Sequence, residues 1–188
     1  MDSENSEAKN SGSAPGGLIH VYYGDGKGKT TAAVGLAVRA AGCGKKVLVA
    51  QFFKGRPSGE VALLDALAEI TVLRDDSSDK FMWEMNEEES AAYAASQAAL
   101  LSEAWNLAVA GSYDLLVLDE VLYLPFYEIV SEQQLLDMLR SKPSQLEVVL
   151  TGHESGAALQ QAADYVTQMV KLKHPYDAGI KQRRGIEF

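Results

Sequence analysis

Short apolar runs alternate with longer alanine-rich or amphipathic segments along most of this chain. The apolar runs predict strands at residues 18–23, 46–53, 70–74, 115–119, 146–151 and 165–173. The segments between them predict helices at residues 31–41, 60–68, 87–110, 131–140 and 157–163. Continuous apolar strands separated by helices are typical of a sheet that is covered on both faces. The pattern therefore predicts an α/β fold in three layers, with a mostly parallel sheet between two layers of helices.

The amino-terminal residues 1–17 differ from this pattern because they consist mainly of Ser, Asn, Glu, Gly and Ala. Such a composition cannot bury a core, so we expect a disordered tail in isolation. The rest of the 188-residue chain, residues 18–188, is predicted to form a single domain.

Charge and composition narrow the class of protein further. The formal net charge of −9 disfavours non-specific binding of nucleic acid. The sequence lacks an apolar run that could cross a bilayer and an apolar signal core, which predicts a cytoplasmic protein without a membrane partner. The single cysteine, Cys43, excludes an internal disulfide and argues against a thiolate metal cage.

The segment between the first strand and the first helix carries the clearest chemistry. A glycine loop that leads from a strand into Lys-Thr at a helix start is typical of a nucleotide polyphosphate site. Glycines let backbone N–H groups turn toward an anion, and the helix terminus adds unpaired donors. Lys29 would supply charge to phosphate oxygens, and Thr30 a hydroxyl to Mg²⁺ or Mn²⁺. The predicted ATP-binding residues are Gly24, Asp25, Gly26, Lys27, Gly28, Lys29, Thr30 and Thr31.

This loop departs from the standard pattern in two ways. Tyr23 stands where the standard spacing has its first glycine, so the loop is one residue shorter. We therefore expect the phosphate chain to sit differently from its position in ordinary ATPases. The loop also holds a second lysine, Lys27, for which we favour a phosphate contact over a solvated position.

An acidic pair closes the strand at residues 115–119. An Asp at the end of such a strand can hold Mg²⁺ directly or through water, so Thr30, Asp119 and Glu120 are the candidate metal ligands. Which of the two carboxylates touches the metal stays open. Lys54, after the second strand, is either part of the site or a surface lysine.

Two aromatic side chains, Phe81 and Trp83, lie in an otherwise polar loop at residues 75–86. They could anchor this loop on the core, which is the commoner use, or line a pocket for a large flat ligand. His153 and His174 are more often structural than catalytic at such positions. No arrangement in the sequence indicates a protein nucleophile or a general base.

Taken together, these motifs resemble one enzyme family. The likeness rests on several short segments. They are the short loop at residues 24–31, residues 51–55 and 59–60, Phe81 to Trp83, Leu118 to Glu120, residues 151–152, the His-x-x-Asp-Ala-Gly segment at 174–179 and the Gly-Ile-Glu-Phe ending. They resemble the ATP:corrinoid adenosyltransferases of the cob(I)yrinic acid a,c-diamide type over residues 18–188. Asp25 is a departure, because family members usually carry Asn there.

The resemblance implies a P-loop, RecA-like fold and a specific reaction. In this family a cobalt(I) corrinoid attacks C5′ of the ribose of ATP, and triphosphate leaves. Since cobalt is the nucleophile, the protein needs only to position the reactants and stabilise charge, and Lys29, Thr30 and Glu120 would be the catalytic residues. Phe81 and Trp83 would lie on the corrinoid side and keep a lower cobalt ligand away. The resemblance also implies a homodimer and a flavoprotein that supplies electrons.

Two other functions stay open from the residues. The loop and Asp119–Glu120 would also suit a P-loop ATPase or a small-molecule kinase, with Glu120 orienting water and Arg183 or Arg184 reaching the γ-phosphate. A non-catalytic regulator that binds nucleotide or corrinoid is the third reading.

Overall fold

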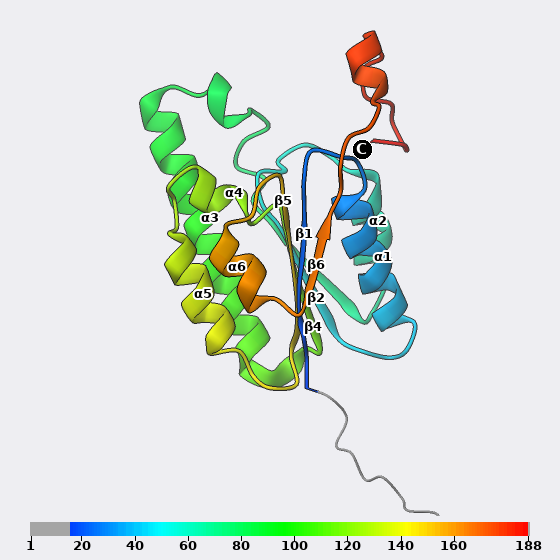
Figure 1. Cartoon of the computed structure of the whole chain (residues 1–188), viewed down its shortest axis with the longest axis vertical. Helices are drawn as coiled ribbons and strands as arrows, with labels where there is room; N and C mark the ends of the chain where they lie inside the picture. Colours follow the sequence, from blue (N-terminus) through cyan, green and yellow to red (C-terminus); the bar gives the residue numbers. More distant parts are fainter. Residues whose placement is uncertain (1–15, 188) are drawn as a thin grey trace, which may run out of the picture.

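The computed structural model of this protein describes residues 16–187, which contain one six-stranded sheet (Figure 1). The strand order is β3-β2-β4-β5-β1-β6, and every pairing is parallel. The strands are β1 (Ile19–Tyr23), β2 (Val47–Gln51), β3 (Ile70–Arg74), β4 (Leu115–Asp119), β5 (Glu147–Gly152) and β6 (Tyr165–Gln168). The parallel α/β fold predicted from the apolar runs is confirmed.

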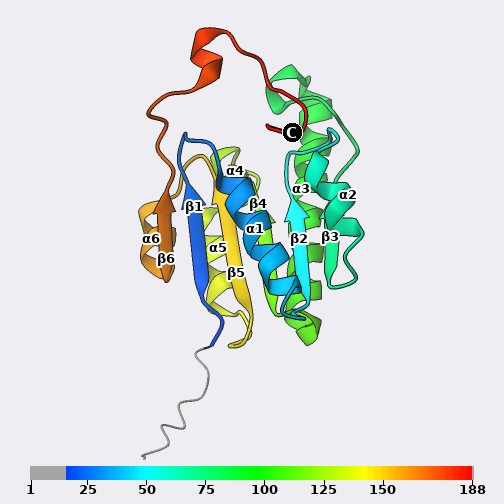
Figure 2. The ribbon, with the colours of Figure 1, turned by 90° about the vertical axis from the view of Figure 1, so that its right-hand side faces the viewer.

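Helices cover both faces of this sheet (Figures 1 and 2). One face carries α1 (Lys29–Ala41) and α2 (Gly59–Asp65); the other carries α3 (Glu87–Leu107), α5 (Glu132–Arg140) and α6 (Ala157–Ala162). Shorter elements are η1 (Met82–Glu84), the π-helical turn η2 (Ala108–Ser112), α4 (Tyr123–Phe126) and η3 (Pro175–Ala178). The sequence pattern did not predict α4, which is a single turn after β4.

The apolar side chains of the strands divide between two cores because successive residues of a strand point to opposite faces. On β4, Leu115 and Val117 pack with the residues of α1, whereas Leu116 and Leu118 pack with those of α3 and α5. Asp119 lies two residues after Val117, so it also faces α1. The same periodicity that buries the strand thus directs its terminal carboxylate toward the start of α1.

Two strands end earlier than the sequence predicted. β6 was expected to reach residue 173 but ends at Gln168, because the strand it pairs with, β1, ends at Tyr23, which pairs with Gln168. β2 ends at Gln51 rather than residue 53, because Phe53 has a left-handed backbone with φ of 55°. The chain therefore leaves the sheet at the edge where the loops gather.

The predicted disordered tail falls largely outside the described residues, which begin at Gly16. Within the described part, the backbone N–H of Gly17 donates to the carbonyl of Ser144 at 2.7 Å. The division into a tail and a single domain stays a prediction.

Truncating the core should cost much more stability than truncating the surface. Leu118 is only 1% exposed, whereas Leu63 on α2 is 71% exposed. We predict that Leu118→Ala lowers the free energy of unfolding by about 2–5 kcal/mol through lost burial and a residual cavity. Urea denaturation measures this, with Leu63→Ala as the matched control. Equal losses in both variants would contradict the assigned core.

Candidate active site

The glycine loop lies at the carboxyl ends of the strands, directly after β1 (Figure 1). Gly24 and Gly28 both have φ of 118°, a conformation that side chains rarely adopt. A Cβ atom at Gly24 would also lie 2.3 Å from the carbonyl oxygen of Met169. The glycines are therefore required both for the turn and for the close approach of the segment after β6.

The ammonium group of Lys29 is held by this loop. Its Nζ donates to the carbonyl oxygens of Gly24 at 2.6 Å and Gly26 at 2.9 Å. Lys29 is the first residue of α1, so the charge lies where the unpaired N–H groups of the helix begin. The structure thus gathers an ammonium group and a helix terminus at one place, which is an arrangement suited to a polyanion.

A buried carboxylate joins α1 to the sheet. Asp119 is 1% exposed, and its Oδ1 accepts from the hydroxyls of Thr30 at 3.0 Å and Thr151 at 2.8 Å. The Thr151 hydroxyl also accepts from the backbone N–H of Glu120 at 2.8 Å. Thr30 and Asp119, two of the three candidate metal ligands, therefore lie in direct contact, and a threonine of β5 fixes the orientation of the carboxylate.

The other oxygen of Asp119 faces β2. Its Oδ2 accepts from Nζ of Lys54 at 2.6 Å, and the same ammonium donates to the Thr30 hydroxyl at 3.1 Å. The side chain of Lys54 is 22% exposed, so the reading of Lys54 as a simple surface lysine is not supported. Lys54 therefore contacts two of the three candidate metal ligands, Thr30 and Asp119.

Gln51 was not among the predicted site residues, although its position could have indicated it. Its Nε2 approaches Asp119 Oδ2 at 3.4 Å and Glu60 Oε1 at 3.2 Å. Val47 and Val49 of β2 pack on the α1 face, so alternation places Gln51 on the same face as Asp119. This signal was missed in the sequence: Gln51 is a polar residue at the end of the buried strand β2, on the face that also carries Asp119.

Glu120 differs from Asp119 in its surroundings. Its backbone φ is 65°, which turns the chain out of β4, and within the described residues its Oε2 is buried without a hydrogen-bond partner. Burial, and then the charge of Asp119, raise the pKa of Glu120 above that of an ordinary glutamate. The two carboxylates thus have different environments, with Asp119 surrounded by donors and Glu120 favouring its neutral form.

The remaining predicted loop residues point away from this network. Lys27 donates to the carbonyl of Ile186 at 3.1 Å and approaches Glu187 Oε1 at 3.4 Å. Asp25 accepts from the backbone N–H of Lys171 at 3.0 Å, a bond that lowers the pKa of its carboxyl. Thr31 is exposed in the first turn of α1.

Phe81 and Trp83 form a stacked pair on the surface. Their ring centroids are 4.4 Å apart with an interplanar angle of 8°, and the Arg56 guanidinium lies 4.5 Å from the centre of the Phe81 ring. Trp83 is 72% exposed and Phe81 is 38% exposed. The pair does not anchor the loop in the core, and most of the Trp83 side chain is accessible from outside.

A small aromatic cavity lies beside the glycine loop. It has a volume of about 290 Å³ and is lined by Leu122, Tyr123, Phe126, Tyr127, His153 and Glu154. The carbonyl of His153 accepts from the backbone N–H of Gly24 at 2.9 Å, which connects this cavity to the loop. Its volume is at the lower end of ligand pockets, so it suits one part of a larger ligand.

Comparison with known proteins decides the family. Residues 16–188 match the family described as ATP:corrinoid adenosyltransferase BtuR/CobO/CobP. The chain belongs to this family. Its activity is therefore ATP-dependent adenosyl transfer to a corrinoid, and the family predicted from the motifs is confirmed.

Curated corrinoid adenosyltransferases are similar to this protein along nearly the whole chain. The corrinoid adenosyltransferase of Escherichia coli (strain K12) is 36% identical over 178 residues, which cover 92% of this chain and 86% of that protein. The corrinoid adenosyltransferase CobA of Salmonella typhimurium is 36% identical over 174 residues, with the same two coverages. That of Pseudomonas aeruginosa is 34% identical over 177 residues, covering 92% of this chain and 84% of the relative.

Family membership favours the adenosyltransferase over the two other functions considered, the ATPase or kinase and the non-catalytic regulator. Among the described residues, none of the helices is both long and apolar enough to span a membrane.

The partly buried carboxyl of Glu120 should make the stability of the fold depend on pH. A carboxyl whose pKa is raised on folding binds its proton more tightly in the folded state than in the unfolded state. The free energy of unfolding therefore falls as pH rises through the folded pKa. We predict that wild-type stability falls relative to Glu120→Gln as pH rises above about 4.3, the ordinary glutamate value.

Urea denaturation across this pH range measures the difference, and Glu103→Gln, at an exposed position of α3, is the control. A difference between wild type and Glu120→Gln that does not change with pH, or that changes equally in the control, would contradict the account.

Proposed function

We propose that this enzyme transfers the 5′-deoxyadenosyl group of ATP to the cobalt(I) of a corrinoid and releases triphosphate, in the synthesis or salvage of adenosylcobalamin. The observation that carries the proposal is the meeting of Lys29, Thr30 and Asp119 at the edge that also presents Phe81 and Trp83. The proposed polyphosphate site and the exposed aromatic pair are at the same end of the molecule, which supports this edge as the place where the two substrates meet.

In this proposal the phosphate loop binds the group that leaves. Charge grows on the triphosphate oxygen as the bond to C5′ breaks, and fixed donors aimed at that charge lower the barrier. Lys29, Thr30 and the N–H groups at the start of α1 are such donors. Glu120 is proposed as the third catalytic residue, because its carboxyl group adds to the negative charge beside Asp119.

The donor set also fits a divalent cation. The hydroxyl of Thr30 and the carboxylate of Asp119 are hard oxygen ligands, and the ammonium of Lys54 bridges them, so a positive charge is stabilised at this position. Mg²⁺ commonly keeps water and phosphate oxygens as ligands, so it needs few protein side chains. Thr30 and Asp119, with Glu120 next to them, would hold Mg²⁺ or Mn²⁺. When bound, the ion would neutralise phosphate charge.

Phe81 and Trp83 are proposed to contact the corrinoid. A stacked and exposed pair presents a flat apolar surface, and the polar loop around it lets this surface approach the ring. Pressing such a surface against one side of the corrinoid would exclude a lower cobalt ligand. The enzyme is further proposed to be a cytoplasmic homodimer that receives electrons from a flavoprotein.

The direct test is product analysis. The protein is mixed with ATP, Mg²⁺ and a chemically reduced corrinoid, and the products are followed by absorbance and mass. The proposal expects an adenosylated corrinoid and triphosphate in equal amounts. Formation of ADP or inorganic phosphate without an adenosylated corrinoid would overturn it.

The loop lysine should be essential for turnover but not for folding. We predict that Lys29→Ala lowers kcat/KM for ATP by about 10²-fold or more, because an ammonium group aimed at the developing charge is lost. Circular dichroism should show an intact fold. Lys45→Ala, at an exposed lysine beyond the other end of α1, is the matched control. Normal turnover in Lys29→Ala would remove the assigned phosphate role.

The exposed tryptophan should affect activity rather than stability. Because Trp83 is 72% exposed, Trp83→Ala should leave the melting temperature within about 2 °C of wild type. We predict that the same variant loses most activity when the corrinoid starts as cobalt(II), and less when it starts as cobalt(I). A variant that melts earlier but turns over normally would identify Trp83 as a packing residue.

A further inference from the structure

The segment after β6, residues 169–187, is fastened to the phosphate loop at its first residues. The backbone N–H of Gly26 donates to the carbonyl of Met169 at 2.7 Å, and the backbone N–H of Lys171 donates to Asp25 Oδ1 at 3.0 Å. From there the chain arches over the carboxyl edge of the sheet and returns (Figure 2). We call residues 169–187 the C-terminal strap.

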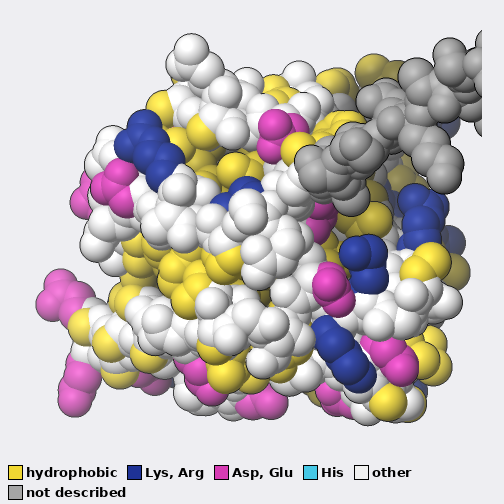
Figure 3. Space-filling model, turned by 90° about the horizontal axis from the view of Figure 1, so that it is seen from below, with side chains coloured by type: hydrophobic (Ala, Val, Ile, Leu, Met, Phe, Trp, Pro, Cys, Tyr) yellow, Lys and Arg dark blue, Asp and Glu magenta, His cyan; other side chains and the backbone are white. Residues whose placement is uncertain are grey.

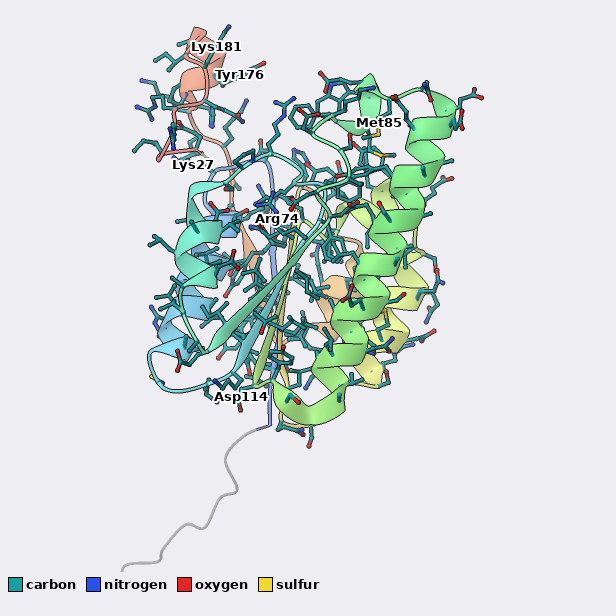
Figure 4. All side chains as sticks on the ribbon, turned by 180° about the vertical axis from the view of Figure 1, so that it is seen from behind. Lys27, Arg74, Met85, Asp114, Tyr176 and Lys181 are labelled. Carbon is teal, nitrogen blue, oxygen red and sulfur yellow. The ribbon has the colours of Figure 1, made fainter. Side chains whose placement is uncertain are left out.

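The strap is fastened a second time at its end. Nζ of Lys27, on the loop, donates to the carbonyl of Ile186 at 3.1 Å and approaches Glu187 Oε1 at 3.4 Å. Figure 4 shows Lys27 below the part of the strap that carries Tyr176 and Lys181. Both ends of the strap therefore depend on three consecutive loop residues, Asp25, Gly26 and Lys27.

The strap also concentrates positive charge in an acidic protein. Five of the seventeen Lys and Arg residues lie between positions 171 and 184, although the net charge of the chain is −9. At the opposite end of the molecule, acidic and basic side chains are interspersed (Figure 3). An arch of cations above a phosphate loop is a suitable approach for a polyanion.

We propose that Glu187 and the polyphosphate of the substrate compete for Lys27. Polyphosphate binding then breaks the contact between Lys27 and the end of the C-terminal strap, and release of triphosphate lets the ion pair between Lys27 and Glu187 form again. This inference rests on the proposed role of the loop in binding triphosphate. It assigns Glu187 as a positioning residue that controls the availability of Lys27.

The surroundings of Glu187 suit such an exchange. Arg183 Nη2 donates to Glu187 Oε1 at 2.9 Å, and the Arg183 backbone N–H donates to Oε2 at 2.8 Å. These bonds lower the pKa of Glu187 to about 2, so the carboxylate stays charged at neutral pH. Because Arg183 lies on the strap itself, Glu187 keeps its partner when Lys27 leaves, and no uncompensated charge results.

The fastening by Lys27 is weak enough to be displaced. The Lys27 side chain is 49% exposed and that of Glu187 is 16% exposed, and their 3.4 Å separation is long for an ion pair, so we treat the pair as a partly exposed one. Such pairs contribute at most about 1 kcal/mol, or about fivefold in affinity. A polyphosphate with several charges therefore outcompetes a single carboxylate, whereas the competition still lowers its apparent affinity measurably.

The experiment measures binding of inorganic tripolyphosphate with Mg²⁺ by isothermal titration calorimetry, on the full chain without corrinoid. Glu187→Gln removes the competitor, so its Kd should be about two- to fivefold lower than that of wild type. Lys27→Met should bind more weakly than wild type, and adding Glu187→Gln to Lys27→Met should change nothing further. Melting temperatures check that all variants fold.

A matched control separates this exchange from a general charge effect. Asp177 is a second acidic residue of the strap, but it pairs with Lys171 at 3.1 Å and not with the loop. Asp177→Asn should leave the Kd unchanged. The inference is overturned if Glu187→Gln weakens or does not alter binding, if Asp177→Asn tightens it equally, or if the effects of Lys27→Met and Glu187→Gln add.

Failure of the proposed function looks different. If wild type does not bind tripolyphosphate at all, both the role of the loop and this inference are wrong. If wild type binds and only the Glu187→Gln result fails, the loop keeps its role and the exchange alone is rejected.

Discussion

The site depends on the burial of one negative charge at the end of β4. A carboxylate that is 1% exposed is stable only if hydrogen bonds and an opposite charge replace water around it. Here two threonine hydroxyls and the ammonium of Lys54 do so, and they come from α1, β5 and the loop after β2. The same bonds that make Asp119 tolerable therefore fix three separate segments around the phosphate loop.

This constraint also explains the difference between the neighbouring carboxylates. Asp119 takes the available donors, and the half-buried Glu120 keeps one buried oxygen unpartnered among the described residues. A low-dielectric position next to a negative charge raises the pKa of Glu120. This pair can serve an enzyme that needs no general base, because a bound cation or phosphate chain would change which of the two carboxyl groups carries a negative charge.

Much of this arrangement could be predicted because it follows from local rules. Strand periodicity places Asp119 on the face of α1, and the glycine spacing predicts the loop that precedes Lys29 and Thr30. Lys54 could not be assigned, since a lysine after a strand is equally compatible with solvent. The contact of Lys27 with Glu187 spans 160 positions, and no local pattern indicates it. The exposure of Trp83 likewise depends on how its loop folds over the edge of the sheet.

The most direct measurement is a crystal structure of the enzyme with Mg²⁺ and a non-hydrolysable ATP analogue. We expect phosphate oxygens against the N–H groups at the start of α1, with the ion within reach of Thr30 and Asp119 and the Lys54 ammonium moved from between them. A nucleotide bound elsewhere, or a loop whose N–H groups contact no phosphate, would contradict the central claim that the short loop grips the departing triphosphate.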